Sequence, residues 1–83
     1  MYQVVLTRQA AKQLAALDRV AARRIQGAIE LLGQNPYPPK ALKLAGRGGY
    51  RVGVGDYRLL YDVIDDQLIV QVLKPGHRRD VYR

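Results

Sequence analysis

The chain has 83 residues, with 14 lysines and arginines against 7 aspartates and glutamates, so its net charge is +7. This length allows one hydrophobic core, and we expect a single domain over residues 1–83. The chain has no cysteine, which excludes a disulfide framework and a thiolate metal site. No stretch reaches the roughly 18 apolar residues of a membrane span, and no signal peptide is evident. We therefore expect a cytoplasmic protein that attracts a polyanion or an acidic protein rather than a membrane.

The N-terminal half of the sequence predicts one strand followed by two helices. Residues 2–6 are apolar and β-branched, as is typical of a strand. Two stretches with apolar residues at helical spacing follow, and Thr7 and Asp18 are their expected N-caps. Gly33 and Asn35-Pro36 are expected to end the second helix. Because a single cap residue separates the two helices, we expect them to fold back as a hairpin.

The C-terminal half predicts three further strands. A Pro-rich and then Gly-rich connection leads into them, and two-residue turns separate them, which favours an antiparallel meander. The predicted strands and turns are residues 50–54, Gly55-Asp56, residues 57–64, Asp65-Asp66 and residues 67–73. The order β-α-α-β-β-β, with the helical hairpin packed on the sheet, is that of an α+β domain.

Arg51 and Arg58 flank the same predicted turn, at Gly55-Asp56. Antiparallel pairing brings such positions side by side, so the two guanidiniums are expected to line one side of the sheet if they share a face. Guanidinium groups suit phosphate oxygens. Asp62 falls on the same face as Arg58 by alternation and is an available partner. The simpler alternative is that each arginine is a solvated surface charge.

The last ten residues, "KPGHRRDVYR", place the only histidine, His77, among basic residues and near Tyr82. His77 is the only side chain whose ordinary pKa, about 6.5, lies near neutrality, so it is a candidate for proton transfer. No glutamate lies in the C-terminal half to serve as a base. The alternatives are a basic tail with an ordinary surface histidine, and a tyrosine that closes the core.

Two stretches, "LKLAGRGGYRVGVGDYR" from Leu42 and "GDYRLLYDVIDDQLIVQVLKPGHRRDVY" from Gly55, resemble the RelE branch of the RelE/ParE superfamily of bacterial toxins. The N-terminal strand and helical hairpin agree with that family in order and length, so the resemblance covers essentially the whole chain. It implies a RelE-like fold and a toxin that pairs with an antitoxin.

The resemblance also implies an activity. RelE-type toxins enter the ribosomal A site and cut the mRNA there, through attack of a 2′-hydroxyl that leaves a 2′,3′-cyclic phosphate without a metal or other cofactor. Gly53 departs from the family, because a second basic residue is usual at its position. The implied catalytic residues are Arg58, His77, Arg78 and Tyr82. The expected RNA contacts are Arg51, Lys43, Arg47, Lys40 and Arg79.

The expected partners are the ribosome with its mRNA and a cognate RelB-like antitoxin. An acidic antitoxin segment would cover Arg51, Arg58 and the basic loop, which gives a hetero-oligomer of toxin and antitoxin. The main alternative is a ParE-like toxin that inhibits DNA gyrase by protein binding, without nuclease activity. A degenerate toxin that only binds its antitoxin is a third possibility. An RNA-recognition-motif module is disfavoured, because its order of elements and its aromatic motif are absent.

Overall fold

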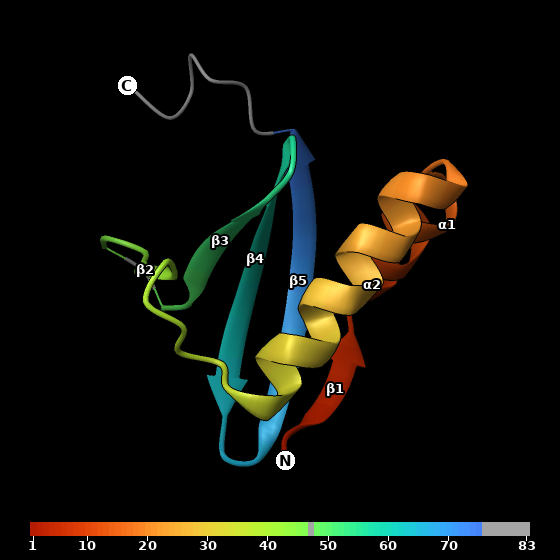
Figure 1. Ribbon diagram of the computed structural model, residues 1–83. Helices are drawn as coiled ribbons and strands as arrows, with labels where there is room; N and C mark the ends of the chain where they lie inside the picture. The colour runs from red at the N-terminus through yellow and green to blue at the C-terminus, as the bar shows by residue number, and fades with distance from the viewer. Residues whose placement is uncertain (47, 76–83) are drawn as a thin grey trace.

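The computed structural model describes residues 1–46 and 48–75 of the chain (Figure 1). Helices and a sheet pack together there, and the predicted α+β class is confirmed. The elements in chain order are β1 (Gln3–Leu6), α1 (Arg8–Ala15), α2 (Arg19–Gln34), β2 (Leu42–Lys43), β3 (Tyr50–Val54), β4 (Tyr57–Ile64) and β5 (Gln67–Pro75). None of the helices in this part of the chain is long and apolar enough to cross a membrane.

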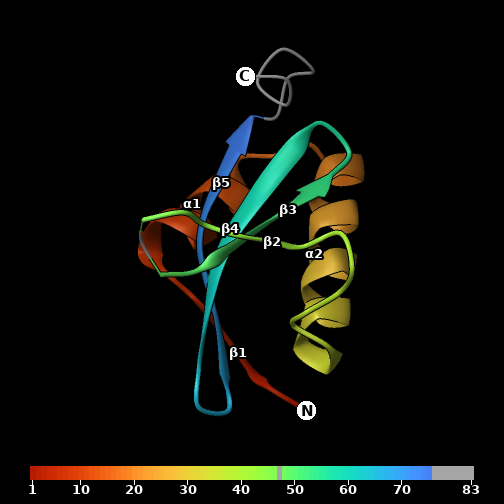
Figure 2. The same ribbon diagram turned by 90° about the vertical axis from the view of Figure 1, so that its left-hand side faces the viewer.

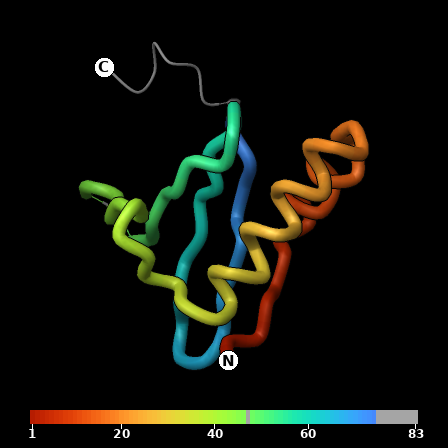
Figure 3. The backbone as a smooth tube through the Cα atoms, viewed as in Figure 1, coloured from red at the N-terminus to blue at the C-terminus, as the bar shows by residue number. Residues whose placement is uncertain are grey.

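The strands form one sheet in the order β1-β5-β4-β3-β2 (Figures 1 and 2). Strands β3 to β5 form the predicted antiparallel meander, and β2, a strand of two residues that was not predicted, extends it by pairing with β3. The sheet as a whole is mixed, because β1 pairs in parallel with β5. Parallel neighbours need a long crossover, and here the two helices and the rest of the meander provide it (Figure 3).

The predicted N-caps occupy the expected positions. Thr7 has extended backbone geometry, and its hydroxyl accepts a hydrogen bond from the Ala10 N–H at 3.2 Å. Asp18 also has extended geometry at the start of α2, but its side chain makes no capping hydrogen bond. Both helices therefore begin where the sequence predicts, although only α1 is capped by a side chain.

Gly33 does not end α2, which continues to Gln34 before Asn35 takes the C-cap position. The glycine instead allows β1 to pass close to the helix. The Tyr2 N–H donates to the Gly33 carbonyl at 2.8 Å, and a Cβ at Gly33 would lie 3.3 Å from Cγ2 of Val4. The small residue is therefore explained by the close approach of β1 to α2.

The core lies between α2 and one face of the sheet. Tyr61 is only 1% exposed within this core, and its hydroxyl donates to the Pro36 carbonyl at 2.6 Å. The ring of Tyr61 stacks on Tyr50, with 5.7 Å between centroids. The buried residues of the core are Ala10, Ile25, Ile29, Leu32, Val52, Leu59, Tyr61, Leu68, Val70 and Leu73.

A β-bulge in β5 changes which side chains face the core. From the Asp65-Asp66 turn up to the pair of Tyr61 and Val70, the two strands pair residue by residue. The next pair joins Leu60 to Val72, so Gln71 is an extra residue in β5. The core-facing positions of β5 therefore change from Leu68 and Val70 to Leu73, and Lys74 comes to lie on the opposite face, paired with Arg58.

Helix α1 holds the bulged segment of β5 in place. The Thr7 hydroxyl donates to the Gln71 carbonyl. The side-chain amide of Gln13 donates to the Leu73 carbonyl at 2.8 Å and accepts from the Leu73 N–H at 2.9 Å. Because β1 ends at Leu6, the amide of Gln13 takes the place that a neighbouring strand would hold along the edge of β5.

We expect Gln13→Met to lower the free energy of unfolding by about 1–3 kcal/mol, because the backbone groups of Leu73 lose both partners. Urea denaturation monitored by circular dichroism measures this loss. The matched control is Gln9→Met on the same helix, where the side chain is exposed and the change should stay within about 0.5 kcal/mol. Equal effects of the two substitutions would contradict the role assigned to Gln13.

We expect Tyr61→Phe to cost about 1–2 kcal/mol at neutral pH, because the Pro36 carbonyl loses its donor. Burial, with smaller contributions from Tyr50 and Tyr37, raises the pKa of Tyr61 to about 12. The unfolded chain has a tyrosine pKa of about 10, so this contribution is complete below pH 10 and is lost as the pH rises through about 12. Urea denaturation between pH 8 and 11.5 should show the difference between wild type and variant shrinking above pH 10. A constant difference would contradict this assignment.

Candidate functional site

The face of the sheet opposite the core carries a row of residues from β3, β4 and β5. Gly53 pairs with Arg58, and Arg58 pairs with Lys74. Directly paired residues lie on the same face, with Cβ atoms about 4.5–5.5 Å apart. The guanidinium of Arg58 and the ammonium of Lys74 therefore project from neighbouring strands on one side of the sheet. We call this side, which faces away from α2, the open face.

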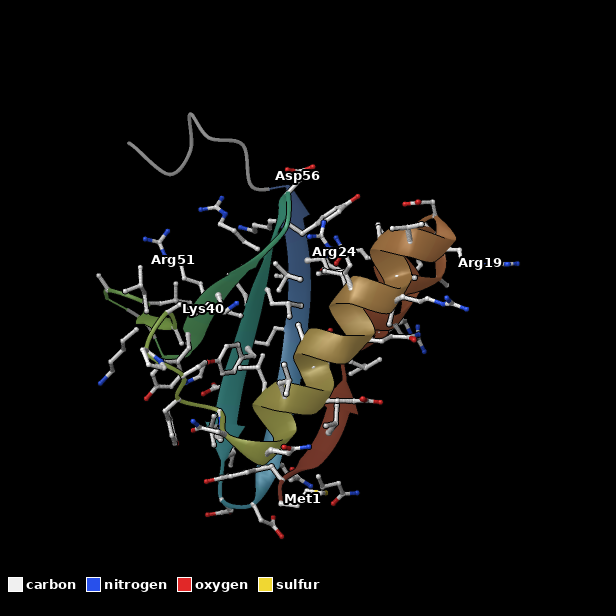
Figure 4. The ribbon with its side chains drawn as sticks, viewed as in Figure 1. Met1, Arg19, Arg24, Lys40, Arg51 and Asp56 are labelled. Atoms are coloured by element: carbon white, nitrogen blue, oxygen red, sulfur yellow. The ribbon has the colours of Figure 1, made fainter. Side chains whose placement is uncertain are left out.

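A second row of residues on the open face contains Arg51 and three apolar residues, Leu60, Val72 and Leu42, which we call the apolar floor. Arg51 pairs with Leu60, which pairs with Val72, and Leu42 continues the row at the edge. Whether Arg51 and Arg58 share a face was left open by the sequence, and the register places them on the same face at diagonal positions. Leu60 is 8% exposed, so the cations surround a buried apolar side chain. Figure 4 shows Arg51 on the side of the sheet away from α2. Arg19 and Arg24, which are labelled in the same figure, belong to α2.

Arg58 is partly buried on the open face. Its Nε is enclosed by protein and has no hydrogen-bond partner among the described residues. Because Nε is enclosed, a ligand on the open face would meet the terminal nitrogens of the guanidinium. Two arginines and a lysine around an apolar floor can bind a phosphodiester through the charges and pack the flat face of a base or sugar on the floor.

Asp62 does not serve as the partner of Arg58 in this arrangement. The two residues are about 13 Å apart along β4, with Leu60 between them on the same face. The Oδ1 atom of Asp62 accepts a hydrogen bond from the Val63 N–H at 2.9 Å, and its Oδ2 lies toward Gly48, 3.9 Å from where a Cβ would be. The carboxylate is therefore engaged locally, which leaves the charge of Arg58 available to an anion.

Lys40 and Lys43 lie apart from this group. Lys43 pairs with Tyr50 and so falls on the core side of the sheet, whereas Arg51 lies on the open face. Lys40 borders a cavity of about 280 Å³ between α2 and β3. The cavity is lined by Ala28, Leu31, Leu32, Gln34, Asn35, Pro38, Lys40, Val52 and Val54. Among the described residues of this lining, Lys40 is the only ionisable one.

Five of the predicted site residues lie outside the described part of the chain, and their roles stay predictions. They are Arg47, His77, Arg78, Arg79 and Tyr82. The last described residue, Pro75, pairs with Tyr57 one position from Arg58. The described chain therefore ends beside the row of Gly53, Arg58 and Lys74 on the open face.

Lys74 is a site candidate that the sequence did not reveal. A regular hairpin from the Asp65-Asp66 turn would pair Arg58 with Leu73 and turn Lys74 toward the core side. Because of the bulge at Gln71, Arg58 pairs with Lys74 instead of Leu73, and Lys74 lies on the open face. One signal was present in the sequence: Leu68, Val70 and Leu73 are separated by two and then three residues, which indicates one extra residue in the strand. Ile69 and Val72, which are also apolar, hide that pattern.

Comparisons with known proteins agree on one family. The family model described as "ParE toxin of type II toxin-antitoxin system, parDE" matches residues 4–82. A RelE-like toxin protein of Escherichia coli is 35% identical over 86 residues, which cover 98% of this chain and 90% of that protein. Toxin RelG of Mycobacterium tuberculosis is 33% identical over 84 residues, which cover 99% and 97%.

A solved structure supports the same conclusion. The archaeal RelE–RelB complex from Pyrococcus horikoshii contains a chain that superposes with a TM-score of 0.78 at 30% identity, over 93% of this chain and 97% of that one. The expected RelE-like fold is therefore confirmed. By family model, sequence identity and fold together, the chain belongs to the RelE/ParE superfamily, and is a toxin of its RelE branch from a type II toxin–antitoxin system.

Proposed function

We propose that this toxin is an endoribonuclease that cuts mRNA in the ribosomal A site and so inhibits translation. The observation that carries the proposal is the cationic group on the open face, where Arg51, Arg58 and Lys74 surround an apolar floor. Helix α2 packs on the other face of the sheet, which leaves this face available to a nucleic acid. A net charge of +7 favours approach to a polyanion.

The proposed reaction is an in-line attack of a ribose 2′-hydroxyl on the adjacent phosphate. A base removes the hydroxyl proton, the bond to the 5′-oxygen breaks, and an acid protonates that leaving oxygen. The products are a 2′,3′-cyclic phosphate and a 5′-hydroxyl. Arg58, with Arg78, would stabilise the charge of the pentavalent transition state. His77 and Tyr82 are the residues proposed for proton transfer, and Tyr82 is alternatively a platform for stacking on a base.

Antitoxin binding is proposed to include the same arginines. The Pyrococcus horikoshii neighbour was solved as a RelE–RelB complex, which supports a RelB-like partner for this chain. We propose that an acidic segment of that partner covers Arg51 and Arg58 on the open face and continues around β2 to Lys43 and Lys40 on the other side of the sheet. The same charges would then attract RNA when the antitoxin is absent and bind the antitoxin when it is present.

A ParE-like activity, inhibition of DNA gyrase by protein binding, is the second candidate. Two observations favour it: the matching family model is described as a ParE toxin, and Gly53 leaves no side chain at a position where a cation is usual in RelE-type toxins. The two candidates differ in what they require of the open face. Cleavage needs the arginines in fixed positions, whereas gyrase binding does not.

The purified protein should cut mRNA within the A-site codon of ribosomes, as read by primer extension. Arg58→Ala should lower the cleavage rate roughly 10²–10³-fold, since it removes charge stabilisation of the transition state. Lys74→Gln should lower it about tenfold, because a flexible ammonium makes a weaker contact than a guanidinium. The matched controls are Arg19→Ala on α2 and Lys12→Gln on α1, both exposed positions where cleavage should match wild type.

Two outcomes would contradict this function. Comparable rates on free RNA and on ribosome-bound mRNA would contradict the dependence on the ribosome, because codon orientation there should supply most of the rate. Absence of cleavage together with inhibition of DNA gyrase supercoiling would favour the ParE-like alternative.

Substitutions in the last seven residues separate the proposed proton-transfer roles. His77→Gln should lower the rate roughly 10²–10⁴-fold if the ring carries a proton, and Arg78→Ala should lower it roughly 10²–10³-fold. Tyr82→Phe keeps stacking and removes the hydroxyl, so a large loss would assign proton transfer to Tyr82. Wild-type rates for His77→Gln in single-turnover cleavage would exclude His77 as the base.

A further inference from the structure

Three tyrosines contact one another on the core side of the sheet, beside the connection between α2 and β2. The ring of Tyr61 is buried, and the ring of Tyr50 stacks on it with 5.7 Å between centroids. Tyr37 meets Tyr50 at a centroid distance of 5.4 Å and an interplanar angle of 70°, the edge-to-face arrangement that aromatic rings favour. Tyr37 itself is 52% exposed. The other two tyrosines therefore support an aromatic ring that a ligand can reach.

Two of the predicted RNA contacts lie beside this exposed ring. Lys43 pairs with Tyr50, so their Cβ atoms are about 4.5–5.5 Å apart on the same side of the sheet. Lys40 follows Tyr37 by three residues in the connection between α2 and β2, and both lysines are exposed. An exposed aromatic ring with cations next to it is typical of a site that binds single-stranded nucleic acid.

The edge strand β2 joins this site to the open face. Successive residues of a strand point to opposite faces, so Leu42 belongs to the apolar floor next to Arg51, whereas Lys43 lies beside Tyr50. Strand β2 has only two residues and is the outermost strand at this edge of the sheet. An RNA strand on the open face can therefore pass over Leu42, turn around the edge and reach Lys43 and Tyr37.

We propose that Tyr37 is a stacking platform for a base of the substrate RNA that flanks the cut site, with Lys43 and Lys40 contacting the adjoining phosphates. The inference rests on the proposed nuclease function and extends its RNA-binding surface around β2. Every base has a flat face, so the platform contributes affinity rather than sequence preference. The acidic antitoxin segment proposed to continue around β2 would cover the same residues and compete with the RNA.

The competing interpretation is that Tyr37 only covers Tyr50. Leucine at residue 37 would still cover Tyr50 but has no flat ring, whereas phenylalanine keeps the ring. The backbone N–H of Tyr37 donates to Oδ1 of Asn35 at 3.1 Å, and neither substitution removes that hydrogen bond. Tyr37→Leu and Tyr37→Phe therefore separate covering from stacking.

The test measures binding of two RNA probes that are 2′-O-methylated at every position and so cannot be cut. One is a trinucleotide, the length of a codon, and the other is an octanucleotide that can continue around β2. Wild type should bind the octanucleotide more tightly. Tyr37→Leu should weaken octanucleotide binding roughly 5- to 100-fold, as the loss of one stacked base requires, and should leave trinucleotide binding unchanged. Tyr37→Phe, the matched control, should bind both probes as wild type does.

The salt dependence of binding tests the lysine contacts. Lys43→Gln should reduce the slope of log Kd against log salt concentration by about 0.7 for the octanucleotide, because a single strand loses one phosphate contact. Tyr37→Leu should leave this slope unchanged, since stacking involves no phosphate. Lys12→Gln on α1 is the control for an exposed lysine and should also leave it unchanged.

Wild-type affinity of Tyr37→Leu for the octanucleotide would overturn the proposal, and so would an equal loss for Tyr37→Phe, which keeps the ring. Equal effects of Tyr37→Leu on the two probes would overturn the path around β2. An unchanged salt slope for Lys43→Gln would overturn the phosphate contact. None of these measurements depends on cleavage, so a wild type whose RNA binding depends on Tyr37 but that never cuts mRNA would contradict the nuclease function alone.

Discussion

The extra residue in β5, Gln71, links the helices to the cationic face of the sheet. Without it, the hairpin register would turn Lys74 toward the core and bring Leu73 to the open face, which would bury a charge and expose a core residue. Helix α1 and its N-cap stabilise the bulged register, because the Thr7 hydroxyl donates to the carbonyl of Gln71 itself and the Gln13 side chain hydrogen-bonds to the backbone of Leu73. The arrangement of charge around Arg58 therefore depends on contacts made on the edge of β5.

The two faces of the sheet have different roles: one packs in the core, and the other carries the residues proposed to bind RNA. One face packs on α2 through the apolar core and the buried Tyr61, whose polar atom is satisfied by a backbone carbonyl. The open face holds Arg51, Arg58 and Lys74 around Leu60, and Arg58 keeps one buried donor unpaired among the described residues. A buried donor without a partner and a group of like charges both cost stability, and an anionic ligand on the open face offsets the repulsion between the charges. A protein with a small core can keep these charges on its surface, because binding of an anionic ligand or an acidic partner to the folded state adds to its free energy of unfolding.

Periodicity predicted much of the fold and part of the site. The period-2 pattern of β3 and β4, with a two-residue turn between them, predicted that Arg51 and Arg58 lie on neighbouring strands, and Thr7 was identified as a cap from its position before an apolar stripe. That the two arginines share a face followed only from the strand register. Lys74 was missed because a bulge reverses the alternation on which such predictions rest. The contact that explains Gly33 joins β1 to α2, residues distant in sequence, so no local pattern could show it. Gly53 was recognised only as a departure from a family pattern.

We propose that the RNA lies on the open face of the sheet, against Arg58. A structure of the toxin bound to a ribosome, with an mRNA carrying a 2′-O-methyl group at the cut position, would locate the RNA on the protein. We expect the phosphate next to the blocked 2′-oxygen to contact Arg51 and Arg58, with Lys74 beside the RNA backbone. An mRNA bound along α2 or in the cavity next to Lys40, with the open face empty, would contradict it.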